Sequence, residues 1–147
     1  AALMLKGLTA WFLLRRCHRV KRGEWILLHA AAGGVGLIAL QWATALGARV
    51  IAVVGSDEKA ALVRGQGAAE VIVSGRENVP ERVRAITRGR GVPVVYDGVG
   101  KDTFLASLDS LAPLGLMVSF GNASGPVPPV APLELTRRGS LFLTRPT

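Results

Sequence analysis

The sequence has a single cysteine, Cys17, among 147 residues, so it cannot form an internal disulfide bond. This shortage favours a reducing compartment, and we expect a cytoplasmic protein. Acidic residues are also few: 10 Asp and Glu stand against 18 Lys and Arg, which gives a net charge of +8. Such an excess of cations raises the question of a nucleic-acid partner. We expect none, because the cations are scattered apart from one cluster at residues 15–22, and few aromatic residues lie among them.

No Lys, Arg, Asp or Glu occurs between Trp25 and Ala48, a run long enough to span a bilayer as a helix. Adjacent glycines interrupt this run, which also contains His29 and Gln41. A buried strand followed by a helix explains the same hydrophobicity, because parallel strands covered on both faces are apolar throughout. We therefore expect no membrane-spanning segment.

A glycine-rich turn follows the apolar strand expected at residues 25–30. Ala31, Gly33 and Gly36 occupy the positions of the dinucleotide fingerprint GxGxxG, with alanine in the first glycine position. In that motif the first small residue permits a sharp turn, the second lets the backbone approach a phosphate, and the third lets the helix lie close to the strand. A helix that starts here directs free N–H groups at the ligand. The turn therefore predicts a pyrophosphate site.

Strand and helix patterns alternate along the whole chain, and half of its residues are apolar, enough for one core. This order predicts an α/β fold: a doubly wound parallel sheet, or Rossmann fold, with three layers and about six strands. The expected strands are residues 25–30, 49–54, 70–73, 93–96, 116–120 and 140–144. The expected helices are residues 3–16, 34–47, 58–64, 78–88 and 103–112, and the proline-rich residues 126–132 are expected to form a loop.

The end of the second expected strand indicates which dinucleotide binds. NAD-binding proteins usually carry an acid there, which holds the ribose hydroxyls, but here Val54 and Gly55 occupy that position. Without a carboxylate to repel it, a 2′-phosphate can bind, with Ser56 and Lys59 close by as donors. Asp57 leaves an alternative open: it is either a capping or first-turn acid of the next helix, or the ribose acid, which would favour NAD. We expect NADPH.

Groups for metal or nucleophilic chemistry are sparse. Cys17 and His18 are adjacent, but no second ligand pair lies near them, so no metal is expected. His29 is interpreted as a core or rim histidine at a strand end. Asp97 ends another strand and is expected to orient turn amides rather than to move protons. No Ser/His/Asp arrangement and no paired carboxylates are expected at one edge of the sheet, so the catalytic residues stay unknown.

Four segments together resemble a known family: KGLTAWFLLRR at residues 6–16, HAAAGGVGLIALQWATALGA at residues 29–48, VVYDGVGKDTF at residues 94–104 and GLMVSFGNASG at residues 115–125. The chain is similar to the quinone oxidoreductase (zeta-crystallin-like) branch of the medium-chain dehydrogenase/reductase superfamily. The resemblance implies reduction of quinones or enones with NADPH, without a metal. It also implies a separate GroES-like substrate domain outside these 147 residues, so we expect a piece of a longer protein whose 1–147 segment is the NADP-binding Rossmann domain.

The resemblance also assigns cofactor contacts by matching position. It implies that Thr9 touches the nicotinamide side and that Gly34 and Val35 bind the pyrophosphate. For the adenosine phosphate it implies Gly55, Ser56 and Lys59, and for the nicotinamide ribose region Gly98, Phe120 and Gly121. Where relatives have a tyrosine near the 2′-phosphate, this chain has Ser74, followed by Gly75 and Arg76. Arg76 is either a donor to the phosphate or a solvated loop residue.

The last expected strand lies at a sheet edge, and exposed strand edges tend to pair. In the family that the chain resembles, this edge joins the same strand of a second subunit, so a homodimer is expected. Two alternatives to the quinone oxidoreductase stay open at this point: a non-catalytic NADPH-binding module or sensor, and an enoyl reductase of the same superfamily. This segment alone is expected to bind NADPH with little or no catalysis.

Overall fold

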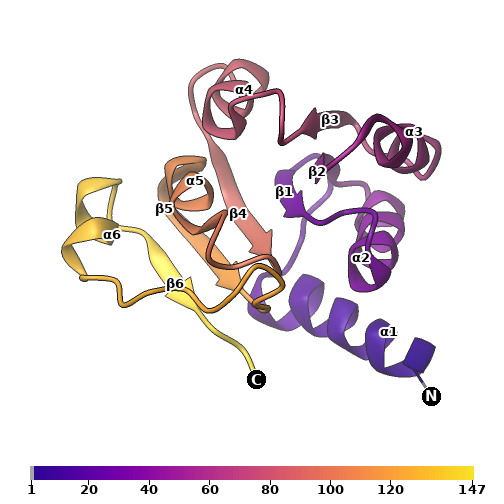
Figure 1. Cartoon of the computed structure of the whole chain (residues 1–147), viewed down its shortest axis with the longest axis horizontal. Coiled ribbons are helices and arrows are strands. Elements are labelled where there is room, and N and C mark those ends of the chain that lie inside the picture. The colour runs from indigo at the N-terminus through magenta and orange to yellow at the C-terminus, as the bar shows by residue number, and fades with distance from the viewer. Residues whose placement is uncertain (1) are drawn as a thin grey trace.

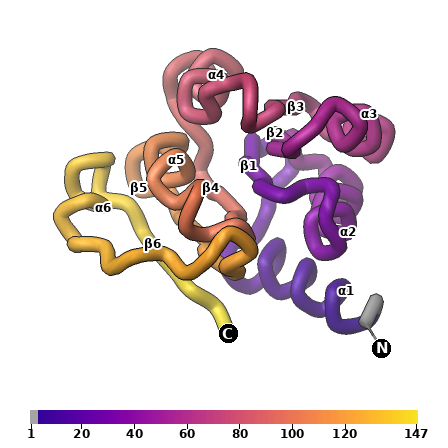
Figure 2. The backbone as a smooth tube through the Cα atoms, in the orientation of Figure 1, coloured from indigo at the N-terminus to yellow at the C-terminus, as the bar shows by residue number. Residues whose placement is uncertain are grey.

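The computed structural model describes residues 2–147, with side chains from Met4 onward. It contains one parallel sheet of six strands in the order β3-β2-β1-β4-β5-β6, which confirms the predicted Rossmann fold (Figure 1). The strands are β1 (Trp25–His29), β2 (Arg49–Val54), β3 (Glu70–Val73), β4 (Val92–Asp97), β5 (Leu111–Ser119) and β6 (Phe142–Thr144). The tube in Figure 2 shows α3 at one end of the sheet and the segment of α6 and β6 at the other.

Helices cover both faces of the sheet and make the three expected layers. One core contains side chains of α1 (Ala2–Phe12), the π-helix η1 (Leu13–Cys17), α2 (Gly34–Ala45) and α3 (Asp57–Gly65). The other contains side chains of α4 (Val79–Ile86), α5 (Phe104–Asp109) and, at its margin, α6 (Leu133–Arg137). Successive residues of a strand alternate between the two cores: Ile26 and Leu28 face the first, and Leu27 faces the second. This is why the strands are apolar throughout.

Local sequence signals fix most of these boundaries. The Ser56 side chain accepts a hydrogen bond from the Lys59 amide at the start of α3, and Asn78 does the same for the Glu81 amide at the start of α4. The bounds of β2 and β3 are the predicted ones. The run from Trp25 to Ala48 forms β1, the glycine turn and α2, as expected. Among the residues that the structure describes, no helix is both long and apolar enough to cross a membrane.

Two predicted elements differ most from the structure, and one helix was not predicted. The first helix changes from α to π geometry at Leu13. The sequence did not predict this change, because the apolar period does not distinguish the two helix geometries. Strand β5 begins at Leu111, five residues before its predicted start, and its pairing with β4 shifts register between Val92 and Val94. Helix α6 has only five residues and was not predicted; Arg138 supports it through ion pairs with Glu134 and Asp109.

Candidate cofactor-binding site

The turn after β1 includes Ala31, as the motif spacing predicted, and it begins at Ala30. Ala30 has a φ of 52°, in the left-handed region that residues other than glycine seldom adopt. Ala31 is fully buried, and its N–H donates to the carbonyl of Val53 at 3.2 Å, which continues the pairing of β1 with β2. The turn therefore begins one residue before the first position of the fingerprint, and that position is small because it is packed in the core.

Of the other two fingerprint positions, Gly36 has the predicted packing duty, and the phosphate contact of Gly33 stays a prediction. A Cβ atom on Gly36 would overlap the carbonyl oxygen of Ala30 and lie 2.9 Å from the Cα atom of Ala31, so only glycine lets α2 lie this close to the strand. Gly33 is exposed, and a Cβ atom there would meet only the Ala30 oxygen, at 3.3 Å. Its backbone (φ −77°, ψ 179°) is open to any residue. Glycine at position 33 therefore keeps the space in front of the helix free.

The start of α2 is built to receive an anion. No side chain caps this helix, so its first-turn N–H groups, which include those of Gly34 and Val35, lack a partner within the helix. Lys6 of α1 lies over the same turn: its Nζ and Cε atoms come within 2.8 Å of a Cβ atom placed on Gly34. A cation beside the positive end of a helix dipole is unfavourable by itself, by about 0.3–1 kcal/mol. An anion bound between them removes that cost.

A cleft of about 490 Å³ opens beside this turn, at the carboxyl ends of β1 and β2. The loop after β4 also lines the cleft, which therefore includes the switch point of the strand order between β1 and β4, where open α/β sheets bind ligands. Four of the predicted site residues line the cleft: Gly33, Gly55, Lys59 and Ser74. The rest of its lining comes from the ends of β1 and β2 and from the loop before α5, namely His29, Ala30, Ala32, Val53, Val54, Val99, Asp102 and Thr103.

At the β2 and β3 end of the cleft, several polar groups are already engaged. Ser56 caps α3 through its oxygen, which leaves its hydroxyl proton free to donate. The Ser74 hydroxyl donates to the carbonyl of Val54 at 3.3 Å. Asp57 is a first-turn acid rather than the cap, and both of its carboxylate oxygens accept hydrogen bonds from Arg76, at 2.6 and 2.8 Å. Lys59 therefore lines the cleft with its own side chain, and the Ser56 hydroxyl proton stays free to donate at the start of α3.

The β4 and β5 ends are closed by their own packing. A Cβ atom on Gly121 would lie 2.7 Å from the Gly98 carbonyl oxygen, and one on Gly98 would lie 2.9 Å from the Phe120 ring. These two glycines are explained by contact between the loops, and they do not line the cleft. Phe120 instead joins Thr9 in a second cleft of about 330 Å³ beside α1. The structure thus separates the predicted nicotinamide-side residues Thr9 and Phe120 from the phosphate-side residues.

A buried network joins β1, β4 and α5, contrary to the expectation that no Ser, His and Asp would meet. The Ser107 hydroxyl donates to Asp97 at 2.7 Å and lies 3.0 Å from Nε2 of His29. The other oxygen of Asp97 accepts the N–H groups of Val99 at 2.9 Å and Gly100 at 3.1 Å, which confirms its predicted role in orienting turn amides. Sequence spacing could not reveal this meeting because His29 and Ser107 are 78 positions apart.

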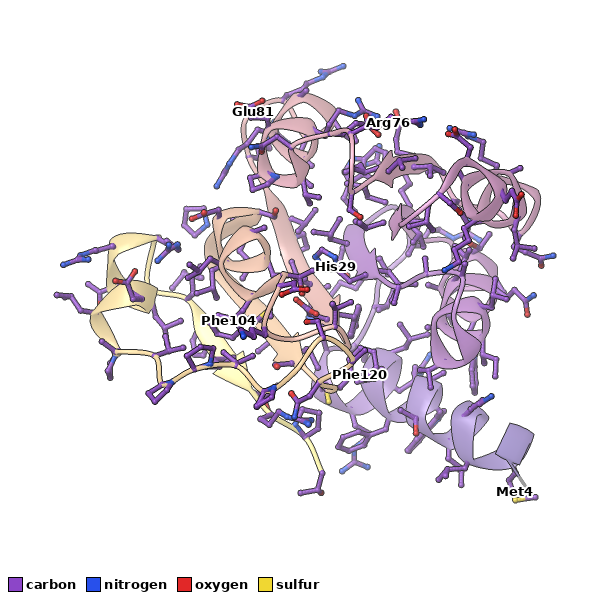
Figure 3. All side chains as sticks on the ribbon, viewed as in Figure 1. Met4, His29, Arg76, Glu81, Phe104 and Phe120 are labelled. Atoms are coloured by element: carbon purple, nitrogen blue, oxygen red, sulfur yellow. The ribbon has the colours of Figure 1, made fainter. Side chains whose placement is uncertain are left out.

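The order of these groups does not suit nucleophilic chemistry. Serine activation requires the histidine between the serine and the acid, whereas here Ser107 lies between His29 and Asp97. Ser107 is fully buried and His29 is 2% exposed, so His29 is the core histidine that was predicted (Figure 3). Burial lowers the pKa of His29, and the nearby Asp97 carboxylate opposes that effect. The network holds the β4 turn against β1 below the cleft.

Two residues near the cleft were missed by the sequence analysis. Lys6 could have been predicted from the sequence, because it lies three residues before Thr9 and therefore on the same side of α1. Thr103 donates to Asp97 at 2.6 Å and lines the cleft, but only the fold brings it there. The remaining predicted cofactor contacts stay predictions.

Comparison with known proteins identifies the family. Residues 34–145 match the model of a family described as zinc-binding dehydrogenase. The chain is 58% identical to a quinone oxidoreductase of Pseudomonas aeruginosa and 50% identical to a 2-haloacrylate reductase of a Burkholderia species; these matches cover 100% and 99% of this chain. The crystal structure of Escherichia coli quinone oxidoreductase complexed with NADPH is 53% identical, with a TM-score of 0.95 over 97% of this chain and 44% of that chain.

Zinc does not fit the part of the molecule that the structure describes, although the family description names it. Within residues 2–147, no group of three or more His, Cys, Asp or Glu side chains is placed to hold a metal ion. The chain also spans only 45% and 44% of the two curated relatives. The match over residues 34–145 and the identities to quinone oxidoreductases confirm the resemblance drawn from the motifs. The chain belongs to the quinone oxidoreductase branch of the medium-chain dehydrogenase/reductase superfamily.

Proposed function

We propose that this chain binds NADPH as the cofactor domain of an oxidoreductase that reduces quinones or related unsaturated carbonyl compounds. The observation that carries the proposal is the uncapped start of α2 beside Gly33, which opens into the 490 Å³ cleft at the sheet's switch point. Relatives named for quinone reduction, and one of them crystallised with NADPH, support it. Bound NADPH supplies the reducing equivalents.

The chain's own residues serve to bind and orient the cofactor. The N–H groups of Gly34 and Val35 would hold the pyrophosphate, with Lys6 as a second source of positive charge. Ser56 and Lys59 would hold the 2′-phosphate at the end of β2. Thr9 and Phe120, which share the cleft beside α1, would contact the nicotinamide end. Because the groups are fixed at strand and helix ends, the cofactor would bind in one orientation.

The acceptor would bind largely outside this chain. The curated relatives are more than twice as long as these 147 residues, and we propose that the remainder forms the GroES-like substrate domain. A quinone and a 2-haloacrylate, the substrates named for two relatives, both carry a conjugated double bond. This shared feature supports a conjugated acceptor, and we propose that its reduction is zinc-independent. The single cysteine supports a reducing, cytoplasmic compartment.

A homodimer through β6 is part of the proposal. This strand is at the edge of the sheet, and its Phe142 and Leu143 side chains are 59% and 40% exposed. An exposed, apolar edge strand tends to pair with another strand. Light scattering at high protein concentration tests the proposal: a dimeric mass supports it, and a monomeric mass for both the chain and its Phe142→Glu variant contradicts it.

Calorimetric titration of the chain with NADPH and NADH tests the cofactor assignment. We expect NADPH to bind at least about tenfold more tightly, the effect of one charge-assisted hydrogen bond. Equal affinity, or tighter NADH, would overturn the assignment of Ser56 and Lys59. Adding a quinone to the NADPH complex and following NADPH oxidation separates the enzyme from the sensor: oxidation by the longer protein supports the enzyme, and its absence there supports the non-catalytic module.

A further inference from the structure

An ion pair at the rim of the cleft joins the start of α3 to the turn after β3. Asp57 is the first residue of α3, and Arg76 lies in the turn that follows Val73. Nη1 of Arg76 lies 2.8 Å from Oδ2 of Asp57, and Nη2 lies 2.6 Å from Oδ1. This two-bond geometry is the strong form of an arginine–carboxylate pair. It occupies both carboxylate oxygens with one partner.

The pair is adjacent to the groups assigned to the adenosine phosphate. Asp57 follows Ser56 directly, and Lys59, two residues further on, lines the cleft. On the other side, Ser74 lines the same cleft two residues before Arg76. Figure 3 shows Arg76 at the outer surface beside β3. The pair therefore lies where the end of β2 faces the end of β3, which is where the ribose of the adenosine would be placed.

Asp57 is the first carboxylate after β2 and is therefore the group best placed to favour NADH over NADPH. A free acid near this strand end accepts hydrogen bonds from ribose hydroxyls and repels a 2′-phosphate. Here the acid is charged, since hydrogen bonding to Arg76 lowers the pKa of Asp57, but its charge is matched by the guanidinium. Once the pair is counted as neutral, Lys59 is the charged residue that lines the β2 and β3 end of the cleft, whereas Asp102 lines it from the loop before α5.

We propose that Arg76 is a cofactor-specificity residue that acts by pairing with Asp57, so that the site accepts the 2′-phosphate of NADPH. The proposal rests on the proposed NADPH binding and extends it to a residue outside the glycine fingerprint. Arg76 does not need to touch the cofactor in this arrangement. Its guanidinium instead removes Asp57 as a ribose acceptor and as a source of repulsion.

A double-variant series on the 147-residue chain separates pairing from direct contact. The variants are Arg76→Gln, Asp57→Asn and the combination of both, titrated calorimetrically with NADPH and NADH. Adenosine 2′,5′-bisphosphate and AMP serve as smaller probes of the same subsite. Arg90→Gln is the matched control, because it removes one arginine charge from a different cleft, at the amino ends of the strands.

We expect Arg76→Gln to weaken NADPH and adenosine 2′,5′-bisphosphate by about three- to tenfold, the size suited to an exposed pair. NADH and AMP should bind as before or more tightly. Asp57→Asn should bind NADPH at least as tightly as the unaltered chain, and the combined variant should bind it as tightly as the unaltered chain and more tightly than Arg76→Gln. Because both side chains are exposed, by 59% and 74%, all variants should keep the circular dichroism spectrum of the fold.

Two outcomes would overturn the proposal. Unchanged NADPH affinity in Arg76→Gln would show that the pair does not act on the cofactor. A combined variant as weak as Arg76→Gln alone would show that Arg76 contacts the phosphate itself. Both differ from failure of the proposed function, in which the unaltered chain would bind neither dinucleotide.

Discussion

The Ser107 hydroxyl of α5 lies 3.0 Å from Nε2 of His29 at the end of β1, and it donates its only proton to Asp97. His29 must therefore donate from Nε2 to the Ser107 oxygen, which fixes its neutral tautomer. The contact joins two elements that are 78 positions apart in the chain. It supports the cofactor cleft from below, because His29 also lines that cleft.

Stability should decrease in acid because of His29. Burial lowers the pKa of His29 below its ordinary value of 6.5. In the range just below 6.5 the unfolded chain binds a proton that the folded chain does not, so stability rises with pH there. The contribution of neutral His29 to the free energy of unfolding is therefore complete above about pH 6.5. Below that pH it falls by up to about 1.4 kcal/mol per pH unit. Urea unfolding between about pH 7 and pH 5 measures it.

His29→Gln provides the control for that measurement. A glutamine amide can donate to Ser107 from a similar position but does not titrate. All other titrating groups are common to both proteins, so the difference between the two pH profiles isolates His29. Parallel profiles would contradict the assignment.

Substitutions at the two fingerprint glycines should have opposite effects on fold and binding. Gly36→Ala should cost about 1–3 kcal/mol of stability, because its methyl group meets the backbone of Ala30 and Ala31. Gly33→Ala should cost less than about 1 kcal/mol, since its backbone geometry is open to alanine. It should nevertheless weaken both NADPH and NADH by about tenfold or more, because the methyl group occupies the phosphate position. Urea unfolding and calorimetric titration of the same two variants check both statements. Undiminished dinucleotide binding by Gly33→Ala would contradict the assignment of the phosphate position to Gly33.

Lys6→Met should weaken NADPH and NADH equally, by about three- to tenfold. The physical reason is that Lys6 lies over Gly34, at the pyrophosphate position, and the pyrophosphate is common to both cofactors. The same titrations measure the effect, with Lys21→Met as a matched control in the turn before β1, at the opposite edge of the sheet. A loss confined to NADPH would place Lys6 at the 2′-phosphate instead.

The sequence was sufficient to predict features that depend on the spacing of apolar residues within one element or on the room that a glycine leaves beside the backbone. The bounds of β2 and β3 and the need for glycine at position 36 follow from patterns within about twenty residues, and the alternation of strands and helices along the chain predicts the doubly wound parallel sheet. Contacts between distant residues could not be predicted, because nothing in the spacing brings Ser107 to His29 or Arg76 to Asp57. The left-handed backbone of Ala30 could not be predicted for another reason: alanine gives no signal of that conformation.

Tyr96→Phe should leave the protein as stable or more stable by about 1 kcal/mol. The Tyr96 side chain is 1% exposed, and within the described part of the chain its hydroxyl has no hydrogen-bond partner. A buried hydroxyl without a partner costs about 1–3 kcal/mol, and removing it keeps the shape of the ring and the packing of β4. The midpoints of urea unfolding compare the two proteins, provided that the unfolding free energy depends equally on urea concentration in both. Ser110→Ala is the matched control, because the buried Ser110 hydroxyl donates to the Ala106 carbonyl at 2.7 Å, so its removal should cost about 1 kcal/mol. A loss of stability in Tyr96→Phe as large as in Ser110→Ala would mean that the Tyr96 hydroxyl has a partner in solution, such as an internal water.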